Sequence, residues 1–318
     1  MNILRFKLSF FLIFALLLVS TSLFAQQLRV GSYNLRYDNP GDSLNSWKYR
    51  KDIMGKLILF HDFDIFGTQE GLHHQLDDLS DRLPGYDYIG VGRDDGINKG
   101  EHSAIFYKED MFQLLEKGDF WLSQDPSQPN KGWDAVLPRI CSWGKFRKKS
   151  TGLTFFLFNV HFDHVGTIAR KESAQLILDK IKIIAGDSPT LLTGDFNVDQ
   201  NSDSYLVINN SKILKDTYDK ALLKYGPEGT FNGFKINTHS ESRIDHIFVT
   251  KDFSVLKHGV LTDTYQTSET DLEELANSGA YPQEIILYQN QARLPSDHYP
   301  ILSVIEYKCN NEKNRIQD

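Results

Sequence analysis

The sequence predicts an α/β protein in which helices pack outside β-sheets. Short apolar or alternating segments typical of strands dominate the chain, segments with helical spacing lie between several of them, and no internal repeat divides the chain. The length fits one large domain with two sheets. The predicted strands cover residues 28–34, 64–69, 86–91, 103–107, 140–146, 154–161, 190–195, 243–249 and 299–307.

Three segments between these strands have apolar residues at helical spacing. The first covers residues 47–61, and the second covers residues 72–83, where leucines recur every three or four positions until Pro84 and Gly85 stop the pattern. The third covers residues 167–185 and ends at a glycine. Because each pattern is apolar on one side, we expect these helices to cover the sheets from outside.

The remaining segments are interpreted as loops. Residues 146–153 carry a charged turn between two strands, which predicts a solvated hairpin tip. Residues 262–295 are polar and acidic, and we interpret them as an insertion ahead of the last strand rather than a second domain. Residues 309–318 are predicted to be a disordered tail, so that the folded domain would span residues 26–308.

The first 25 residues have the pattern of an export signal. Arg5 and Lys7 precede an apolar run over residues 8–19, and Ala25 ends a cleavage pattern of small residues. The apolar run is short for a membrane span, although an uncleaved anchor is the alternative. No second long apolar run follows. We therefore expect residues 1–25 to be removed and the mature chain to be exported, to the periplasm or the medium, without a stable membrane span.

The charge of the chain argues mildly against a nucleic-acid binder. The full chain has 35 basic and 42 acidic residues. Cleavage after Ala25 would remove two of the basic ones, Arg5 and Lys7, and leave 33 against 42, a formal net charge of −9. Such a surface does not attract polyanions from a distance, but it leaves room for a locally positive cleft loaded with metal.

Two cysteines do not make a disulfide framework. Cys141 lies in an alternating strand, where we expect a buried thiol, and Cys309 lies in the polar tail. Whether the two pair is left open by the sequence.

Polar side chains follow the first two predicted strands. Asn34 ends the first strand and Arg36 follows it, while Glu70 comes directly after the second, whose run is apolar enough to be buried. Glu70 is suited to a hard metal ion, Asn34 to a metal or a bound water, and Arg36 to a phosphate. The alternatives are a turn asparagine with a surface arginine, and an acid favoured near the start of the next helix.

Asp195 and Asn197 form a more specific pattern because an apolar strand leads directly into the acid. In an extended chain the two side chains share one face, and Phe196 points to the other. An acceptor and a donor side by side could hold and polarise one water. An Asx turn is the alternative interpretation, which we consider weaker.

A buried aspartate needs a partner, and the chain offers one. Asp245 lies in a mostly apolar strand, where an unpaired carboxylate is costly. His298, in the string Ser296-Asp297-His298, is the expected partner. An aspartate bonded to one imidazole nitrogen leaves the other free to act as a base. Asp297 would then face a metal, although a solvated loop before an edge strand is the alternative.

His161 ends another strand and could donate a hydrogen bond to a phosphate oxygen, with Glu101 fixing its ring. Taken singly, an ordinary hydrogen-bonded histidine is the simpler interpretation. Together, the polar residues at strand ends indicate an oxygen-rich, histidine-assisted site for a divalent cation and a phosphate ester.

These strings together resemble the endonuclease/exonuclease/phosphatase superfamily of DNase I-like, metal-dependent phosphoesterases. The resemblance extends from about residue 30 to residue 306 and implies a four-layer α-β-β-α sandwich, with the site where loops of the two sheets meet. The residues that carry it occur in the family's order: Asn34, Glu70, Glu101, His161, Asp195, Asn197, Asp245, Asp297 and His298.

The resemblance implies a role for each residue. Glu70 would bind Mg²⁺, with Mn²⁺ as the other candidate, helped by Asn34 and Asp297. His298, oriented by Asp245, would take the proton of the attacking water.

The same resemblance assigns the phosphate contacts. Asp195 and Asn197 would position the water and the phosphate, and His161 with Glu101 would stabilise the phosphate or assist the leaving group. Arg139 lies where the family often has a phosphate-contacting residue. Arg36 stands where some DNA-repair members carry an acid, which favours one metal over two.

The sequence therefore predicts a secreted, Mg²⁺-dependent phosphoesterase that hydrolyses a phosphodiester, or a phosphomonoester, by direct attack of water. It is expected to be a monomer. A small or head-group diester is slightly preferred to long DNA, because no dense basic segment lines a groove. A nuclease, a sphingomyelinase-like lipid phosphodiesterase and a catalytically silent module that binds a phosphorylated ligand are the alternatives.

Overall fold

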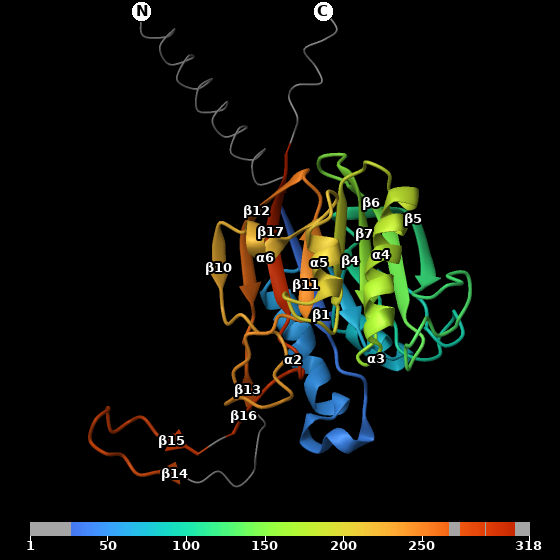
Figure 1. Cartoon of the computed structure of the whole chain (residues 1–318). Helices are drawn as coiled ribbons and strands as arrows, with labels where there is room; N and C mark the ends of the chain where they lie inside the picture. The colour runs from blue at the N-terminus through green and yellow to red at the C-terminus, as the bar shows by residue number, and fades with distance from the viewer. Residues whose placement is uncertain (1–26, 267–273, 290, 309–318) are drawn as a thin grey trace, which may run out of the picture.

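Two β-sheets pack face to face, and helices cover both outer faces (Figure 1). The computed structural model describes residues 27–266, 274–289 and 291–308. One apolar core lies between the sheets, and one lies beneath the helices on each side. The predicted four-layer α-β-β-α sandwich is confirmed.

The first sheet carries the first two predicted site strands at its centre. Its strands occur in the order β10 (Leu223–Tyr225), β12 (Phe253–Val260), β17 (Ile301–Tyr307), β1 (Gln27–Asn34), β2 (Ile65–Gln69), β4 (Ile105–Lys108) and β3 (Tyr86–Ile89). β1 runs parallel to β2 and antiparallel to β17. The carboxyl ends of β1 and β2 therefore meet the start of β17 at one edge of the sheet.

The second sheet brings its site strands to the same edge. Its strands occur in the order β5 (Phe112–Trp121), β6 (Ile140–Lys148), β7 (Thr154–His161), β8 (Thr190–Asp195), β11 (Asp245–Val249) and β9 (Lys215–Asp216). β7 and β8 are parallel, and His161 is opposite Asp195. β11 is antiparallel to β8, and its first residue, Asp245, is opposite Asp195. Hydrogen-bond register thus places three site side chains in one row.

The three predicted helices form. They are α2 (Trp47–Phe60) and α3 (His73–Ser80), which pack on the first sheet, and α4 (Thr167–Ile184), which packs on the second. Three short helices were not predicted, namely η1 (Pro40–Asn45), which contacts α2, α5 (Asp203–Asn209), which lies beside α4, and the one-turn α6 (Thr217–Lys220), which contacts β9, β11 and β12. Each predicted helix is therefore confirmed. Figure 1 shows α4 and α5 side by side on the second sheet.

Four strands of the two sheets were not predicted. Two of them, β9 and β10, are edge strands of only two and three residues. The other two, β5 and β12, are longer, and each has a physical reason. β5 is an edge strand whose middle, including Glu116 and Lys117, is exposed and polar. In β12 a bulge between Val255 and Lys257 shifts the register of the strand. Apolar and polar side chains therefore do not alternate regularly along its whole length.

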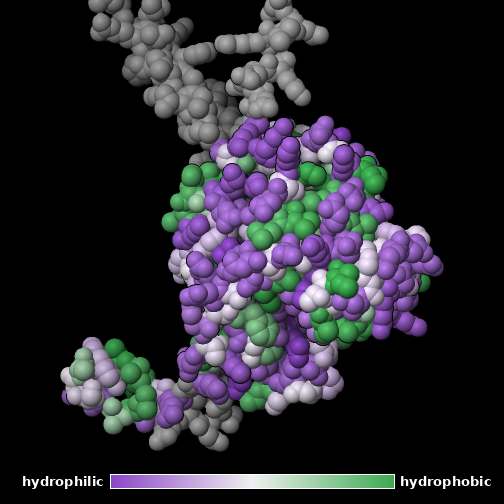
Figure 2. Space-filling view, viewed as in Figure 1, coloured by the Kyte–Doolittle hydropathy of each residue, from purple (hydrophilic) through white to green (hydrophobic). Residues whose placement is uncertain are grey.

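The predicted insertion contains two short ribbons. β13 (Tyr265–Gln266) pairs with β16 (Ala292–Arg293), and β14 (Glu274–Leu275) pairs with β15 (Leu287–Tyr288). We call residues 274–289 the arm, because this segment projects away from the sandwich (Figure 1). Figure 2 shows apolar side chains gathered on the arm beside a mainly hydrophilic body. The exposed apolar residues of the arm are Leu275, Ile285, Ile286, Leu287 and Tyr288.

The predicted signal peptide over residues 1–25 and the predicted tail over residues 309–318 lie outside the described residues. Within the described ranges, no helix combines the length and the apolar character needed to cross a bilayer. Cys141 is a buried free thiol, as expected, and Cys309 lies in the tail.

A buried polar network joins the two sheets below the predicted site. The Asn159 Oδ1 atom accepts hydrogen bonds from Gln69 Nε2 at 2.8 Å and from Thr193 Oγ1 at 3.0 Å. Its Nδ2 atom donates to the carbonyl oxygens of Thr68 and Ala104 at 2.8 and 3.0 Å. One side chain of the second sheet thereby satisfies several groups of the first.

Replacing Asn159 with leucine is expected to lower the free energy of unfolding by at least about 3 kcal/mol, because several buried polar groups lose their partner at once. Urea unfolding followed by circular dichroism measures the change. Thr193→Val, which removes a single donor of the network, should cost about 1 kcal/mol. Equal effects of the two substitutions would contradict the central role of Asn159.

A buried histidine outside the predicted site should make stability depend on pH. His258 is 3% exposed, and its Nδ1 atom lies 3.0 Å from the hydroxyls of Thr217 and Ser303. Burial lowers the pKa of His258 to about 4, against the partial opposition of Asp216. The unfolded chain therefore binds a proton first as the pH falls below the ordinary histidine pKa of about 6.5.

His258 is thus expected to reduce the free energy of unfolding by up to about 3 kcal/mol as the pH falls from 6.5 to 4. His258→Gln cannot be protonated, so its stability should fall less steeply over that window. Chemical unfolding of both proteins at a series of pH values measures the difference. Parallel curves would show that His258 does not contribute.

Candidate active site

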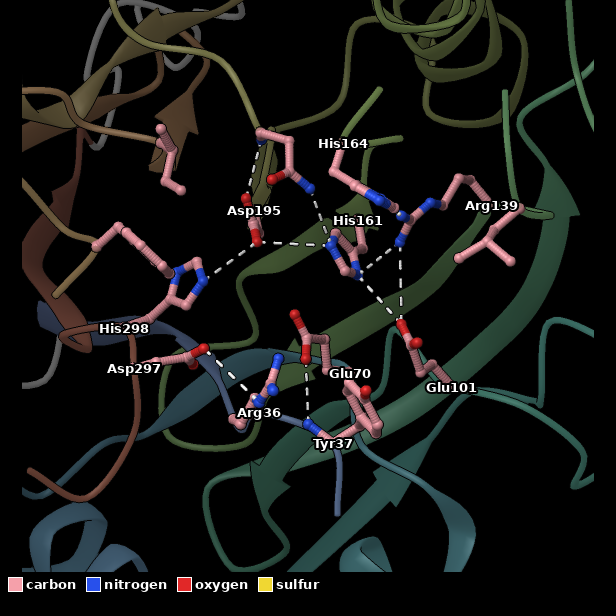
Figure 3. A pocket seen from close by; sticks show the side chains of 14 residues that line it. Arg36, Tyr37, Glu70, Glu101, Arg139, His161, His164, Asp195, Asp297 and His298 are labelled. Carbon is pink, nitrogen blue, oxygen red and sulfur yellow. Dashed lines mark hydrogen bonds and ion pairs between the residues drawn. The ribbon is translucent and has the colours of Figure 1, made fainter. Parts of the chain in front are cut away.

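The predicted site residues converge on one cavity of about 560 Å³ (Figure 3). Its walls are formed by Arg36, Tyr37, Glu70, Glu101, Leu137, Arg139, His161, His164, Asp195, Asn197, Phe231, Ile244, Asp297 and His298. Nine of the eleven predicted site residues are in this set. The other two, Asn34 and Asp245, are buried behind the wall and contact the side chains that form it.

Three side chains at the centre could hold a metal ion. Glu70, Asp195 and His298 each offer one ligand atom, and these atoms lie within 4.8 Å of one another. Asn34 links the three, since its Nδ2 atom donates to Glu70 Oε1 at 3.1 Å and to Asp195 Oδ2 at 2.9 Å and lies 3.4 Å from His298 Nε2.

The arrangement differs in detail from the predicted metal ligands. The Asn34 Oδ1 atom accepts from the backbone N–H of Arg36 at 2.9 Å, so this amide supports the carboxylates of the cluster. The Asp297 carboxylate lies 3.8 Å from the guanidinium of Arg36 and outside the group of three. Glu70 is common to the predicted ligand set and the observed cluster.

The predicted pair of Asp245 and His298 forms. His298 Nδ1 lies 2.9 Å from Asp245 Oδ2, and both residues are buried. The Thr230 hydroxyl fixes the start of this strand by accepting the backbone N–H of Asp245 at 3.1 Å. The ring of Phe231 packs edge-to-face on His298, with 5.0 Å between centroids. The Nε2 atom of His298 is therefore the one directed at Asn34 and Asp195.

The charge state of His298 follows from its neighbours. Burial disfavours the imidazolium, but the carboxylates of Asp245 and Asp195 outweigh it and raise the pKa of His298 well above its ordinary value. Burial also raises the pKa of Asp195, against the attraction of His298. These two carboxylates thus favour the protonated imidazole of His298.

His161 has a different partner from the one predicted. Arg139 Nη1 donates to His161 Nδ1 at 3.1 Å, whereas Glu101 Oε2 lies 3.5 Å away, beyond a good hydrogen bond. Glu101 is instead paired with Arg93 at 2.6 and 2.8 Å. Burial, reinforced by the charge of Arg139, lowers the pKa of His161 to about 3. His161 is consequently neutral, with its Nε2 atom 3.5 Å from Asp195 Oδ2.

Arg139 and Arg36 line the cavity, and each also binds other side chains of the protein. The Arg139 guanidinium, 4% exposed, also contacts His164 at 2.9 Å and Asp163 at 3.4 Å. The Arg36 guanidinium is paired with Asp42 at 3.0 Å. Both arginines reach the cavity where they were predicted to meet phosphate, and each is already oriented by a carboxylate.

The chain after β8 does not continue as the extended segment that was predicted. Asn197 has a positive φ of 49°, and its backbone N–H donates to Asp195 Oδ1 at 2.9 Å, which makes an Asx turn. The Asx turn, which we considered the weaker interpretation, is therefore present, and Asn197 is part of the site as well. Asn197 still faces the cavity, with Nδ2 3.1 Å from His161 Nε2, and Phe196 is buried on the other side.

Three non-glycine residues of the cavity have left-handed backbones, namely Arg36 (φ 56°), Glu70 (φ 63°) and Asn197 (φ 49°). This conformation costs roughly 1 kcal/mol or more for residues with a side chain, and such costs concentrate at functional sites. Glu70 directly follows a strand end, and Arg36 and Asn197 each lie two residues after one, so in each case a turn at the end of a strand directs the side chain into the cavity.

Sequence reasoning missed Tyr37, Thr230 and Phe231. Tyr37 acts through its backbone, because its N–H donates to Glu70 Oε2 at 3.1 Å. Thr230 and Phe231 lie in an irregular segment and reach the site only through tertiary contacts. Tyr37 could have been found from its neighbour Arg36, but no sequence signal marks the other two.

Comparison with known proteins supports a common origin. The model of the endonuclease/exonuclease/phosphatase family matches residues 31–298. A solved family member from Bacteroides thetaiotaomicron is 50% identical, with a TM-score of 0.80 over 89% of this chain and 98% of its own. A mannosyl-6-phosphatase of the same species is 50% identical, with a TM-score of 0.80 over 88% of this chain and all of its own.

A protein of Acanthamoeba polyphaga mimivirus is 29% identical over 220 residues, which are 65% of this chain and 81% of that protein. The matched segment of the family model begins in β1 and ends at His298, so it contains the whole set of converging residues. The chain belongs to the endonuclease/exonuclease/phosphatase family of phosphoric ester hydrolases.

Proposed function

We propose that this chain is an exported, Mg²⁺-dependent phosphoesterase that hydrolyses a phosphorylated sugar by direct attack of water. The observation that carries the proposal is the cluster of Glu70, Asp195 and His298, with the Asp245–His298 pair at its edge, in one open cavity. The pattern of residues 1–25 supports export.

The choice of a sugar phosphate rests on a relative. The mannosyl-6-phosphatase that is 50% identical to this chain is covered over its whole length. This similarity favours a phosphomonoester over the small diester that the sequence slightly preferred. The cavity fits such a substrate because it combines polar groups with the exposed ring of Phe231 at its rim.

The donor set fits a divalent cation of the Mg²⁺ type. Carboxylate oxygens are the ligands that Mg²⁺ prefers, and Glu70 would provide the principal one. The Glu70 carboxylate accepts one hydrogen bond at each oxygen and has further lone pairs available. Asp195 from the central cluster, or Asp297, would complete the ligands, and Asn34 would hold the carboxylates of Glu70 and Asp195 in place. When bound, the cation supplies charge neutralisation for the phosphate oxygens.

The protein groups would divide the remaining work. His298 is proposed to take the proton of the attacking water through Nε2, while Asp245 holds its ring from Nδ1. To act as a base, the His298 imidazole must be neutral. A cation bound at Glu70 would favour the neutral imidazole, because its positive charge would offset that of the nearby carboxylates. Asp195 and Asn197 would orient the water.

The leaving-group side of the cavity is proposed to depend on His161. Because the neutral ring accepts from Arg139 at Nδ1, Nε2 would carry the proton and donate to a phosphate oxygen once the Asn197 amide nitrogen, 3.1 Å from Nε2, turns away. Arg139 would keep this ring in place, with the Glu101 carboxylate 3.9 Å from the same guanidinium nitrogen. No covalent phosphoenzyme is proposed, because the cavity wall contains no serine or cysteine.

A lipid phosphodiester is the second candidate, and the arm is the observation that favours it. Ile285 and Ile286 are 45% and 55% exposed there, as a segment that enters a lipid surface would require. Glu274 and Glu284 on the same arm oppose binding to anionic lipid. A sugar phosphate needs no such surface and remains the main proposal.

Phosphate release from mannose 6-phosphate, glucose 6-phosphate, sphingomyelin vesicles, single-stranded RNA and bis-p-nitrophenyl phosphate tests the proposal. Assays contain Mg²⁺, Mn²⁺ or excess EDTA. We expect Mg²⁺-dependent release from a sugar phosphate that exceeds release from the diesters. Activity that survives EDTA would overturn the metal mechanism. Tight binding of phosphate esters without any turnover would support a silent binding module instead.

A further inference from the structure

We infer that Arg50 is a positioning residue that holds together two active-site segments, residues 34–36 and 295–298. The inference rests on the proposed function. Arg50 lies on α2, is fully buried and is absent from the cavity wall, so it acts through other residues.

Arg50 binds backbone carbonyls from three separate segments. Its Nη1 atom donates to the carbonyl oxygens of Leu35 at 2.8 Å and Pro295 at 2.9 Å. Its Nη2 atom donates to Arg36 at 3.1 Å, and its Nε atom donates to Asn45 in η1. One planar group thereby fixes the chain after β1 to the chain before β17.

A buried cation of this kind is unusual because none of the described carboxylates lies within ion-pair distance of it. None of the ion pairs among the described residues includes Arg50. Burial lowers the pKa of Arg50, and the rings of Trp47 and Phe234 lie 5.5 and 5.4 Å from its Cζ atom. Burying a charge is costly unless its donors are satisfied, and here carbonyls and aromatic faces satisfy them. An apolar residue would fill the space without this cost, so the bridge between segments explains the arginine.

Both bridged segments carry the site. Asn34, whose amide links the carboxylates of the central cluster, directly precedes Leu35. Pro295 precedes Ser296, and the Ser296 hydroxyl donates to the Asn34 carbonyl at 2.7 Å. His298 lies two residues further on. A shift between the segments would therefore move Asn34 relative to His298, which are now 3.4 Å apart at Nδ2 and Nε2.

A third segment is attached to the same point. The backbone N–H groups of Asn232 and Gly233 donate to the Asp297 carbonyl at 2.8 and 3.0 Å. Phe234, the next residue, packs over the Arg50 guanidinium. The loop that contains Phe231 at the cavity rim is thus also anchored through Arg50.

Lysine cannot replace Arg50 in this role. Its ammonium is a compact group on a flexible stem, whereas the guanidinium fork reaches four carbonyl oxygens in fixed directions. Arg50→Lys should therefore keep the charge and much of the fold but lose the alignment. Arg50→Met removes the charge as well at similar size.

The chain offers a matched control at the opposite end of β1. Lys148 is also a buried cation, 3% exposed, and its Nζ atom donates to the Gln27 carbonyl at 2.7 Å. Lys148→Met therefore removes a buried charge bonded to backbone, but far along β1 from Asn34. It reports the effect of lost stability alone.

The test measures Mn²⁺ binding by electron paramagnetic resonance, and kcat and KM for the best phosphate ester, below the unfolding temperature of every variant. For Arg50→Lys and Arg50→Met we expect Mn²⁺ binding weakened by about 10-fold or more and kcat lowered by about 10-fold or more, with KM changed less. Lys148→Met should keep all three values within about twofold of the wild type.

Wild-type Mn²⁺ affinity and kcat in a folded Arg50→Lys protein would overturn the inference. Equal losses in Lys148→Met would also overturn it, since they would indicate stability rather than alignment. Absence of turnover by the wild type, combined with weaker Mn²⁺ binding only in the Arg50 variants, would overturn the proposed function and support the role of Arg50.

Discussion

His298→Ala is expected to lower kcat by about 10²–10⁴-fold, the range that general acid–base groups contribute. His298 Nε2 lies 3.4 Å from Asn34 and 3.8 Å from Asp195, inside the central cluster, and no other imidazole there is paired with an aspartate at 2.9 Å. His161 cannot take over, because burial and Arg139 lower its pKa to about 3 and leave it a poor base. Steady-state kinetics at saturating Mg²⁺ measure the loss.

Two further variants separate chemistry from folding. Asp245→Asn should also reduce kcat strongly, because an amide can donate to Nδ1 and then favours the wrong tautomer of His298. His74→Ala removes a histidine paired with Asp38 at 3.1 Å on the surface and should leave kcat unchanged. Activity of His298→Ala above about one tenth of the wild type would remove His298 from the role of base.

The fold could be predicted largely because its central strands are apolar on both faces. β7 and β8 are buried along almost their whole length, one face towards the other sheet and one towards α4. Such segments stand out in the sequence whatever their partners are. β5 and β12 could not be predicted in this way, because edge exposure and a bulge hide their alternation.

The site residues could be predicted because rigid strand ends carry them, and the pairing of strands then brings them together. Asp195, for example, is opposite both His161 and Asp245. The turns after those strands could not be decided from the sequence. At Asn197 an Asx turn and an extended chain were both compatible with the residues, and the structure has the turn. At Glu70 the positive φ accompanies a contact with a segment distant in sequence, the hydrogen bond from the Tyr37 N–H.

The hydrogen-bond partners of the site residues also could not be predicted from the sequence. Glu101 and Arg139 both lie within 4 Å of His161, and only the geometry decides that Arg139 makes the hydrogen bond. Arg50 gave no signal at all, since a single arginine in an amphipathic helix normally indicates an exposed position.

Glu70→Gln is expected to weaken Mg²⁺ and Mn²⁺ binding by more than about 100-fold. Loss of a group that merely supports a ligand typically costs 10–100-fold in metal affinity, and Glu70 is the proposed ligand itself. Glutamine keeps the size and one acceptor oxygen but removes the negative charge. Electron paramagnetic resonance of Mn²⁺ and the Mg²⁺ dependence of kcat measure the change.

The same substitution should not destabilise the metal-free protein, and this separates a functional role from a structural one. Glu70 lies in a cluster with Asp195. Burial raises the pKa of Asp297, the attraction of His298 lowers it, and the negative charge of Glu70 raises it again, so the carboxylates repel one another. Removing one carboxylate relieves this repulsion, so the melting temperature in EDTA should stay equal or rise.

Glu101→Gln is the control, because Glu101 shares the cavity but is paired with Arg93 at 2.6 Å. It should lower the melting temperature and change Mn²⁺ affinity by less than about threefold. If Glu101→Gln weakened Mn²⁺ binding as much as Glu70→Gln does, the metal would have to be placed nearer to His161.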